Sequence, residues 1–304
     1  MKQRRGVVAL DVGGTKIACG LVLPDGSVLS FRSEPTSQES AETLLDQIAC
    51  LVETAVDSAP RDLTTAAAGL IVPGWVDRKT RTVWAPNVAG WDHIRLEQLL
   101  AARLPLPVAL DSDRSGYVEG EAWLGAARGL KDVVFLAVGT GIGAGIMVDG
   151  RVLYGHDDLA GAVGWLALDP RFQDLYARMG CFEAEASGTA VGRKAAERRG
   201  IRWSAAEVVA AAAAGDEPAN RLLDEVVTFL GMGVANLVST LNPEIVVLGG
   251  GLFQAGDFLL ARVRTEFTRW CQPFAARNVR LELSSLGDRA GLLGAARIAM
   301  DIYL

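Results

Sequence analysis

The sequence predicts an α/β protein built from two lobes that share one sheet pattern, and three observations lead to this prediction. Residues 7–31 contain a strand, a turn rich in Gly and Thr, a second strand, an Asp-Gly turn and a third strand, and residues 133–154 repeat that order. A strand follows each glycine turn, whereas a dinucleotide-binding domain needs a helix at that point. With 304 residues, half of them hydrophobic, the chain is long enough to fill a core in each lobe.

The two copies of this repeat give the clearest secondary-structure signal. Asp-Gly between two apolar runs favours a hairpin, because Gly adopts positive φ without steric cost. The expected strands are residues 7–10, 17–23 and 27–31 in the first copy, and residues 133–138, 144–148 and 151–154 in the second.

Helices and shorter strands are predicted between the two copies. Ser40 opens an amphipathic run that ends near Asp57, as expected of a helix packed on a core. Residues 67–72 and 108–110 are apolar enough to form buried strands, and residues 116–127 are predicted to form a helix.

The second half continues with helices and strands. Ser204 and Glu207 resemble a capping box, and a long apolar helix over residues 218–241 ends at an Asn-Pro pair. Gly231 and Gly233 each cost that helix about 1 kcal/mol relative to Ala, which predicts a close approach of another backbone. The remaining expected elements are a strand over residues 245–248, a helix over residues 257–270, a strand over residues 279–284 and a helix over residues 289–302.

Composition and charge argue against several classes of partner. The net charge of −6 argues against a nucleic-acid surface, because neutralising phosphates needs clustered Lys and Arg. No apolar stretch approaches the roughly 20 residues that cross a bilayer, and the first residues lead directly into a strand, so we expect a cytoplasmic protein with no membrane partner. The four cysteines are far apart and form no C-x-x-C pair, which indicates neither a disulfide framework nor a cysteine zinc site.

Three glycine-rich turns are the candidate phosphate sites. Each follows a strand, where backbone N–H groups can surround phosphate oxygens. Thr15 and Thr140 add hydroxyl donors, and Lys16 either supplies charge or caps its turn. The nucleotide-binding residues expected in these turns are Gly13, Gly14, Thr15, Lys16, Gly139, Thr140, Gly141, Gly249 and Gly250.

Two aspartates follow predicted strands and carry alternative interpretations. Asp11 is suited to hold a hydrated Mg²⁺, which prefers oxygen ligands, or it stabilises the bend as an Asx-turn residue. Asp113 follows the strand that ends at Leu110. It either accepts a proton from an attacking hydroxyl or caps the helix that comes next.

Taken together, the motifs resemble those of the ROK family of sugar kinases and repressors, over essentially the whole chain. The matching segments are residues 11–16 with D-x-G-G-T-K, residues 72–77 with V-P-G-x-V-D, residues 85–91 with a-P-N-l-x-G-W, residues 139–143 with the second phosphate motif, residues 242–251 with N-P-x-x-I-V-x-G-G-G, and residues 287–296 with the C-terminal G-x-x-A-x-L-x-G-A-A.

This resemblance implies a duplicated actin/hexokinase-type fold, with two ribonuclease H-like lobes around a nucleotide cleft. Residues 1–112 with residues 289–304 would form the smaller lobe. Residues 113–288 would form the larger lobe, which would carry most of the nucleotide site and the dimer surface. ATP and Mg²⁺ are the implied cofactors, Asp11 would hold the metal through water, and a homodimer is the implied assembly.

The family's catalytic segment, E-N-D-A-N, falls on residues 111–115. The match implies that Asp113 is the general base of phosphoryl transfer. Ser112 stands where relatives have an Asn that contacts a sugar hydroxyl. A hydroxyl has a shorter reach and fewer donors than an amide, so this change affects the choice of acceptor more than the transfer itself.

Other candidate acceptor residues come from loops and helices. Asn87 either binds sugar or caps a turn, and Glu183 either binds a sugar hydroxyl or is a solvated helix charge. Asp158 either compensates for a lost acceptor ligand or belongs to a solvated loop. The full set of expected acceptor residues is Gly74, Asn87, Ser112, Asp113, Asp158 and Glu183.

Two departures from the family pattern concern a sugar ligand and a metal. The family's sugar-contacting Glu is Ala162 here, and its zinc-binding His is Trp165. The family's zinc motif aligns with residues 174–181, of which only Gly180 and Cys181 match. A tetrahedral site needs four ligands, so we expect no structural zinc.

The resulting hypothesis is an ATP-dependent kinase that phosphorylates a hydroxyl, the primary 6-OH, of a hexose, of an amino-hexose such as kanosamine, or of a related cyclitol from an antibiotic-type secondary pathway. The alternative is a catalytically silent, sugar-sensing regulator. Such a regulator would lack the DNA-binding domain of ROK repressors, because the phosphate motif begins at Asp11 and leaves no room for a winged helix. A partner-driven ATPase of the same fold is a third hypothesis, disfavoured by the sugar-loop motifs.

Overall fold

The computed structural model describes residues 4–200 and 202–304. Contacts within the chain divide it into two compact units. The first unit comprises the chain up to Arg128 together with Tyr154–Leu159 and Asp288–Leu304. The second comprises Gly129–Leu153 and Ala160–Gly287.

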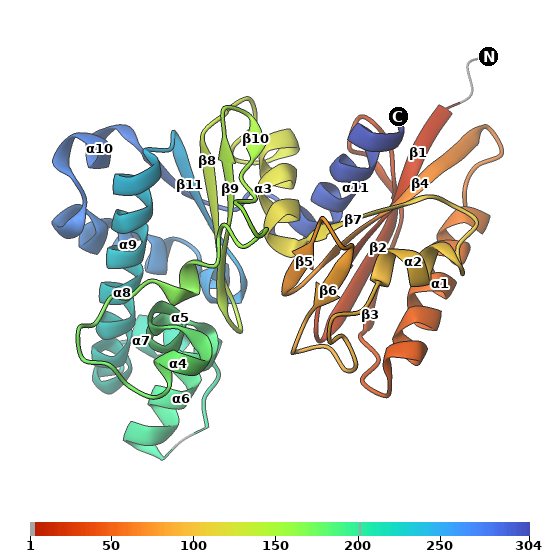
Figure 1. The fold of residues 1–304 in the computed structure, drawn as a ribbon. Coiled ribbons are helices and arrows are strands. Elements are labelled where there is room, and N and C mark those ends of the chain that lie inside the picture. Colours follow the sequence, from red (N-terminus) through yellow and green to blue (C-terminus); the bar gives the residue numbers. More distant parts are fainter. Residues whose placement is uncertain (1–3, 201) are drawn as a thin grey trace. The chain divides into compact units, whose positions relative to one another are not determined.

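The first unit is built on a five-stranded sheet with the order β3-β2-β1-β4-β7 (Figure 1). Its strands are β1 (Arg4–Val12), β2 (Lys16–Val22), β3 (Val28–Pro35), β4 (Leu63–Val72) and β7 (Val108–Ser112). The first three strands pair in antiparallel fashion, and β4 and β7 extend the sheet in parallel to β1. Strands β1, β2, β4 and β7 are mostly apolar and buried, whereas the edge strand β3 is largely exposed.

Helices and a small hairpin complete the first unit. They are α1 (Ala41–Asp57), α2 (Leu96–Ala101), α3 (Asp113–Leu124), α11 (Ala290–Tyr303), and the hairpin of β5 (Trp75–Asp77) and β6 (Thr82–Trp84). Helix α3 packs closely on α11, because a Cβ at Gly294 would lie 1.8 Å from the carbonyl oxygen of Gly116. This contact explains why α3 and the C-terminal helix belong to the same unit.

The second unit repeats the sheet of the first. Its order is β10-β9-β8-β11-β12, again with three antiparallel strands followed by two parallel ones. The strands are β8 (Val133–Val138), β9 (Ile142–Val148), β10 (Arg151–Val152), β11 (Ile245–Gly249) and β12 (Arg280–Leu283). The predicted internal repeat is therefore confirmed, and with it the predicted duplicated α/β fold.

Seven helices of the described chain belong to the second unit. They are α4 (Tyr176–Met179), α5 (Cys181–Ala186), α6 (Gly188–Arg199), α7 (Ala205–Ala213), α8 (Glu217–Leu241), α9 (Asp257–Trp270) and α10 (Pro273–Asn278). The glycines of α8 do meet close neighbours: a Cβ at Gly231 would lie 3.0 Å from the backbone of Glu266, and one at Gly233 would lie 2.4 Å from the ring of Phe182. The predicted close approach is confirmed, although at Gly233 the neighbour is a side chain.

The expectation that no apolar stretch approaches the length of a membrane span was wrong, because helix α8 is long and apolar enough to cross a membrane by length and composition alone. Most of its apolar stretch is buried inside the second unit, including Leu223, Leu230 and Val234. Its apolar character is therefore explained by its place in the core of that unit.

Some boundaries differ from the sequence prediction. Helix α3 begins at Asp113, three residues earlier than predicted, because the hydroxyl of Ser112 accepts a hydrogen bond from the N–H of Ser115 and caps it. The strand predicted over residues 151–154 ends at Val152. The hairpin of β5 and β6 was not predicted, because three-residue strands are too short for alternation to show.

Candidate active site

Two aspartates of the first unit lie in one row across its sheet. Asp11 pairs in register with Ile71 of β4, and Ile71 pairs with Asp111 of β7. Both carboxylates are therefore at the carboxyl ends of parallel strands, which is where ligands bind in open α/β sheets. Burial raises the pKa of Asp11 to about 7, with Asp113 and Asp288 adding to the rise and Lys16 opposing it.

The first glycine turn connects β1 to β2 beside Asp11. The N–H of Gly13 donates to the carbonyl of Lys16 at 2.9 Å and closes the turn. The amine of Lys16 forms an ion pair with Asp288 at 3.2 Å, and both side chains are more than half exposed. Lys16 is therefore paired at this turn with a residue of the C-terminal segment.

Asn87 lies against this same turn. A Cβ at Gly14 would be 3.3 Å from the carbonyl oxygen of Asn87, so a side chain at Gly14 would crowd the Asn87 loop. The predicted phosphate turn and the predicted acceptor residue Asn87 are therefore neighbours within the first unit.

Asp113 is half-buried at the first position of α3. Its carboxylate accepts a hydrogen bond from the N–H of Arg114 at 2.8 Å. Burial raises the pKa of Asp113 to about 6, and the positive charge of Arg114 limits the rise. The guanidinium of Arg114 also donates to the carbonyl of Gly74 at 3.4 Å, so Gly74 lies beside the start of α3.

Ser112 and Asp158 are both engaged in local hydrogen bonds. The Ser112 hydroxyl caps α3 and lies 3.0 Å from the hydroxyl of Ser115. One carboxylate oxygen of Asp158 accepts from the N–H of Arg78 at 3.0 Å. Each of these two predicted acceptor residues thus has a structural partner within the first unit.

The segment Tyr154–Leu159 is held against the β5–β6 hairpin by several contacts. Trp75 donates to the carbonyl of Asp157 at 2.7 Å, and the amine of Lys79 donates to the carbonyl of His156 at 3.2 Å. The guanidinium of Arg78 lies 3.7 Å from the centre of the Tyr154 ring. Residues 156–158 are therefore bonded to the hairpin through two backbone carbonyls and the Asp158 carboxylate, while the side chains of His156 and Asp157 stay mostly exposed, as in a solvated loop.

The second unit brings two glycine turns together. Gly139 closes the β8–β9 turn by donating to the carbonyl of Gly141 at 2.9 Å. Gly250 follows β11 with φ near 89°, and a Cβ there would lie 2.5 Å from the carbonyl oxygen of Val138. Since Gly249 pairs in register with Ala137, both turns lie at the carboxyl ends of parallel strands.

Glu183 of α5 faces the β8–β9 turn. One of its carboxylate oxygens accepts from the N–H of Ile142 at 2.8 Å, and a Cβ at Gly141 would lie 2.6 Å from the same oxygen. Burial raises the pKa of Glu183, with the Ile142 hydrogen bond opposing the rise. Glu183 is thus half-buried against a candidate phosphate turn, which is not the position of a solvated helix charge.

Comparison with known proteins decides the family. The profile of the ROK family matches residues 7–302. The chain belongs to the ROK family. This result confirms the resemblance that the sequence motifs indicated.

Three relatives that are described as glucokinases or a hexokinase match nearly the whole chain. A glucokinase from Thermotoga maritima is 32% identical over 311 residues, which cover 97% of each chain. A solved ROK hexokinase from Thermus thermophilus is 32% identical, covers 98% of this chain and 99% of its own, and superimposes with a TM-score of 0.86. A ROK family glucokinase from Streptomyces griseus, solved with glucose and AMPPNP, is 30% identical with a TM-score of 0.82 and covers 98% and 99% of the two chains.

ROK repressors also match. A xylose repressor from Caldicellulosiruptor bescii is 32% identical over 284 residues, which cover 87% of this chain and 69% of the repressor. The kinase matches span nearly all of both chains, so the comparisons support an ATP-dependent sugar kinase.

The residues at the positions of the ROK zinc motif do not fit a zinc ion. Cys181 is buried, and its sulfur accepts from the N–H of Leu168 at 3.4 Å. Trp165, in place of the His ligand, is 57% exposed. Across residues 4–200 and 202–304, no group of three or more His, Cys, Asp or Glu side chains is arranged to hold a metal ion.

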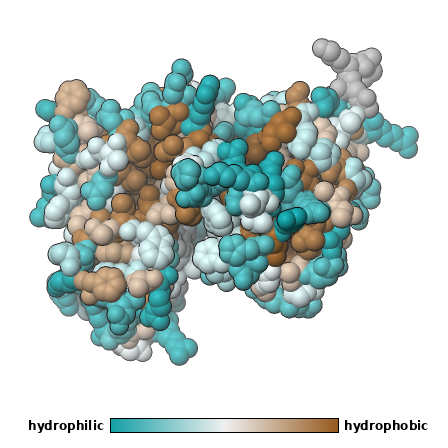
Figure 2. Space-filling view, in the orientation of Figure 1, coloured by the Kyte–Doolittle hydropathy of each residue, from teal (hydrophilic) through white to brown (hydrophobic). Residues whose placement is uncertain are grey.

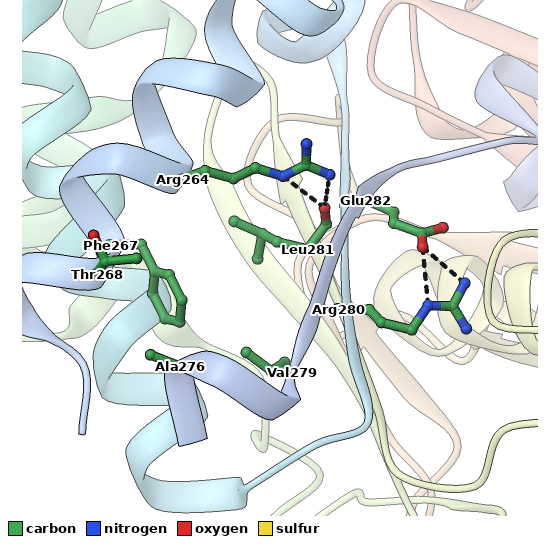
Figure 3. A pocket seen from close by; sticks show the side chains of 8 residues that line it. All are labelled: Arg264, Phe267, Thr268, Ala276, Val279, Arg280, Leu281 and Glu282. Carbon is green, nitrogen blue, oxygen red and sulfur yellow. Dashed lines mark hydrogen bonds and ion pairs between the residues drawn. The ribbon is translucent and has the colours of Figure 1, made fainter. Parts of the chain in front are cut away.

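A surface pocket of the second unit is lined by none of the predicted site residues. It is formed by α9, α10 and β12, and in Figure 3 Arg264 hydrogen-bonds the carbonyl of Leu281 while Arg280 pairs with Glu282. The side chains that line it are Arg264, Phe267, Thr268, Ala276, Val279, Arg280, Leu281 and Glu282. Since they include none of the predicted site residues, this pocket has no part in the proposed chemistry.

Sequence reasoning missed three residues of the candidate site. Arg78 comes directly after the segment that matches V-P-G-x-V-D, Arg114 stands at the Ala position of E-N-D-A-N, and Tyr154 was assigned to the end of a strand. The signal that could have drawn attention to Arg114 is its place directly after the predicted base. Nothing in the local pattern indicates that Tyr154 meets Arg78, because that contact depends on the tertiary fold.

Proposed function

We propose that this chain, an ATP-dependent sugar kinase of the ROK family, phosphorylates the primary 6-OH of a hexose, of an amino-hexose such as kanosamine, or of a related cyclitol. The observation that carries the proposal is Asp113. It opens the helix after β7, it is half-buried, and burial places its pKa near 6. A general base works best when its pKa lies close to the operating pH, which Asp113 satisfies.

The transfer step follows from this placement. Asp113 removes the proton of the acceptor hydroxyl as its oxygen forms a bond to the γ-phosphorus, and the bond between that phosphorus and the departing ADP oxygen breaks. The proton stays on the Asp113 carboxylate until solvent takes it. Most of the rate enhancement in such reactions comes from positioning and from neutralising phosphate charge, to which the backbone N–H groups of the glycine turns contribute.

Mg²⁺ is the cofactor expected with ATP, where it neutralises phosphate charge. Asp11 fits the role of holding it through water, since its pKa is raised by burial and by two neighbouring carboxylates, and a cation favours the ionised form of such a group. The expected phosphate contacts are Gly13, Gly14, Thr15 and Lys16 in the first unit, and Gly139, Thr140, Gly141, Gly249 and Gly250 in the second.

The acceptor site is proposed to differ from that of glucose-specific relatives. Ser112, Ala162 and Trp165 replace an amide, a carboxylate and an imidazole of the family pattern. The Ser112 hydroxyl already caps α3, so it is a poor substitute for an amide that reaches a sugar. Gly74, Asn87, Asp158 and Glu183 remain the proposed contacts.

The experiment is a survey of ADP release with Mg-ATP. Purified protein is tested with glucose, mannose, N-acetylated hexosamines, glucosamine, kanosamine and C7 cyclitols, alongside Asp113→Asn. Asp92→Asn serves as the matched control, because the Asp92 side chain is 83% exposed. We expect turnover on at least one acceptor, lost by at least a thousandfold in Asp113→Asn and unchanged in Asp92→Asn.

A catalytically silent sugar sensor is the second candidate function, favoured by the match to the xylose repressor. It predicts saturable sugar binding by calorimetry with no ADP release on any acceptor of the panel. Turnover that survives in Asp113→Asn would instead remove Asp113 from the mechanism.

We further propose a cytoplasmic homodimer that binds neither nucleic acid nor membrane. All four cysteines are free, as expected in a reducing compartment, and three of them are buried. Figure 2 shows areas of apolar surface on the second unit. Four aromatic side chains of this unit, Trp165, Phe172, Trp270 and Phe274, are each more than half exposed. These side chains support a dimer surface on residues 113–288, and sedimentation velocity would measure the assembly.

A further inference from the structure

A buried charged pair of the second unit has no role in the chemistry described so far. Lys194 of α6 is 6% exposed and Glu185 of α5 is 8% exposed. The Lys194 amine donates to a Glu185 carboxylate oxygen at 2.6 Å and to the Glu185 carbonyl at 3.0 Å. Buried charges are costly unless they are paired and hydrogen-bonded, so such a pair fixes the geometry of the segments it joins.

The pair continues into a wider network, which reaches the surface at Gln173. The hydroxyl of Tyr176, itself 6% exposed, donates to the other Glu185 oxygen at 2.7 Å. Gln173 donates to the Tyr176 hydroxyl at 2.7 Å. On its far side the Lys194 amine lies 5.4 Å from the centre of the Phe229 ring. Both carboxylate oxygens of Glu185 are therefore satisfied, and the network joins α4, α5, α6 and α8.

Helix α5 carries the proposed acceptor ligand on its opposite side. Glu183 and Glu185 are two positions apart, which on an α-helix turns their side chains about 200° from one another. Glu183 accordingly bonds the N–H of Ile142 while Glu185 bonds Lys194. Because α5 has only six residues, its orientation depends on what holds its buried side.

The start of α6, which follows α5 directly, is bonded to the β8–β9 turn. Ser187 ends α5 and caps α6 through the N–H of Ala190. The next two residues reach the β8–β9 turn: the N–H of Gly188 donates to the Gly139 carbonyl at 2.7 Å, and the Thr189 hydroxyl donates to the Thr140 carbonyl at 2.8 Å.

We infer that Lys194, Glu185 and Tyr176 are positioning residues that hold α5, and with it Glu183, in place of the zinc site that the donor set does not support. Glu185 lies two residues after Glu183 on α5, and its pairing with Lys194 holds this helix. Helix α5 begins at the end of the segment that aligns with the family's zinc motif. The inference rests on the proposed function, because Glu183 is an acceptor ligand only if the chain is a kinase.

The test compares substitutions within the network. Lys194→Met leaves the Glu185 carboxylate and carbonyl without their donor. We expect the acceptor KM to rise at least tenfold while kcat changes by less than threefold, since Glu183 binds the acceptor and takes no part in proton transfer. Arg198→Met is the matched control, because Arg198 lies on the same helix and pairs with Glu225 at a site where both side chains are nearly half exposed.

A double variant separates positioning from stability. Replacing both members of a buried ion pair by apolar residues often restores stability. We therefore expect Lys194→Met with Glu185→Met to recover the melting temperature that Lys194→Met loses, while the acceptor KM stays raised. Recovery of the KM together with the melting temperature would show that the pair acts through stability alone and would overturn the positioning role.

A metal measurement tests the other half of the inference. Elemental analysis of the wild-type protein should give far less than one zinc per chain, and dialysis against EDTA should leave the melting temperature unchanged. About one zinc per chain, with a lower melting temperature after EDTA, would overturn it.

The two proposals fail in distinguishable ways. If the wild-type protein turns over no acceptor, the kinase proposal fails, and hydrogen exchange over residues 166–188 in Lys194→Met still reports whether the network holds α5. If the wild-type protein is active and Lys194→Met keeps its acceptor KM, the inference fails and the kinase proposal stands.

Discussion

The hydroxyl of Tyr154 donates a hydrogen bond to the buried carboxylate of Asp111 at 2.8 Å. Asp111 is 6% exposed, two residues ahead of Asp113, and its other oxygen accepts from the N–H of Ser112 at 2.7 Å. The ring of Tyr154 lies under the guanidinium of Arg78. Tyr154 therefore joins the β5–β6 hairpin to the strand that precedes the proposed catalytic base.

Tyr154→Phe is expected to destabilise the first unit. It keeps the ring under Arg78 and removes only the donor to Asp111. Leaving a buried carboxylate oxygen without its partner costs about 1–3 kcal/mol, which urea unfolding would measure as a lower free energy of unfolding. Tyr303→Phe is the matched control, because its hydroxyl donates to a backbone carbonyl at 3.2 Å from a partly exposed position. Equal losses in the two variants would contradict a special role for Tyr154.

Long, regular elements were predictable from the sequence. Ser40 caps α1, and the helix ends at Asp57, as predicted. An amphipathic run of this length is typical of a helix and of no other element. The same holds for α9, whose bounds match the prediction. The glycine turns were predictable because each follows an apolar strand that differs sharply in composition from the turn.

The supports of the site were not predictable. Arg78 and Tyr154 are far apart in the sequence, and neither position shows a pattern that selects the other as its partner. The Lys194–Glu185 pair likewise depends on how α5 packs against α6. Local propensity and periodicity locate elements, whereas contacts between side chains of different elements depend on tertiary register.

Gly291→Ala is expected to disturb Asp11. Gly291 is the second residue of α11, and a Cβ there would lie 2.1 Å from a carboxylate oxygen of Asp11. The gain in helix propensity, about 1 kcal/mol, is offset by a clash of about 1–3 kcal/mol and by displacement of the proposed metal ligand. We expect ATP affinity, measured by calorimetry with Mg²⁺, to fall at least tenfold.

Gly251→Ala provides the comparison for this substitution. A Cβ at Gly251 has no heavy atom within 4 Å among its described neighbours. Its melting temperature should stay within about 1 °C of wild type, since substitutions without a clash change stability by only about 0.5 kcal/mol. A Gly291→Ala protein with normal ATP affinity would show that the Asp11 carboxylate does not contact the metal-nucleotide complex.

The rate of the proposed reaction should depend on the ionisation of Asp113. Burial raises the pKa of Asp113 to about 6, and only the deprotonated form accepts the hydroxyl proton. The acceptor kcat/KM should therefore fall about tenfold per pH unit below pH 6 and level off above it. Arg114→Ala removes the charge that lowers this pKa, so the inflection should move to higher pH, whereas Arg114→Lys should keep it near 6. If the inflection stays at the same pH in Arg114→Ala, the pH profile does not report the ionisation of Asp113.

Glu119 of α3 makes the first unit less stable as the pH rises. Burial raises its pKa to about 7, Asp301 and Asp111 add to the rise, and Arg297 opposes it. Between the unfolded pKa of 4.5 and the folded pKa of about 7, the folded state binds more protons than the unfolded state, so stability falls as pH increases through this window.

Glu119→Gln removes the buried charge. It should raise the free energy of unfolding by about 1–3 kcal/mol at pH 8 and have little effect at pH 4.5, as measured by urea titration at both values. Glu53→Gln, at an exposed position of α1, should change neither value, and a Glu119→Gln protein whose gain is the same at both pH values would show that the carboxylate is not the cause.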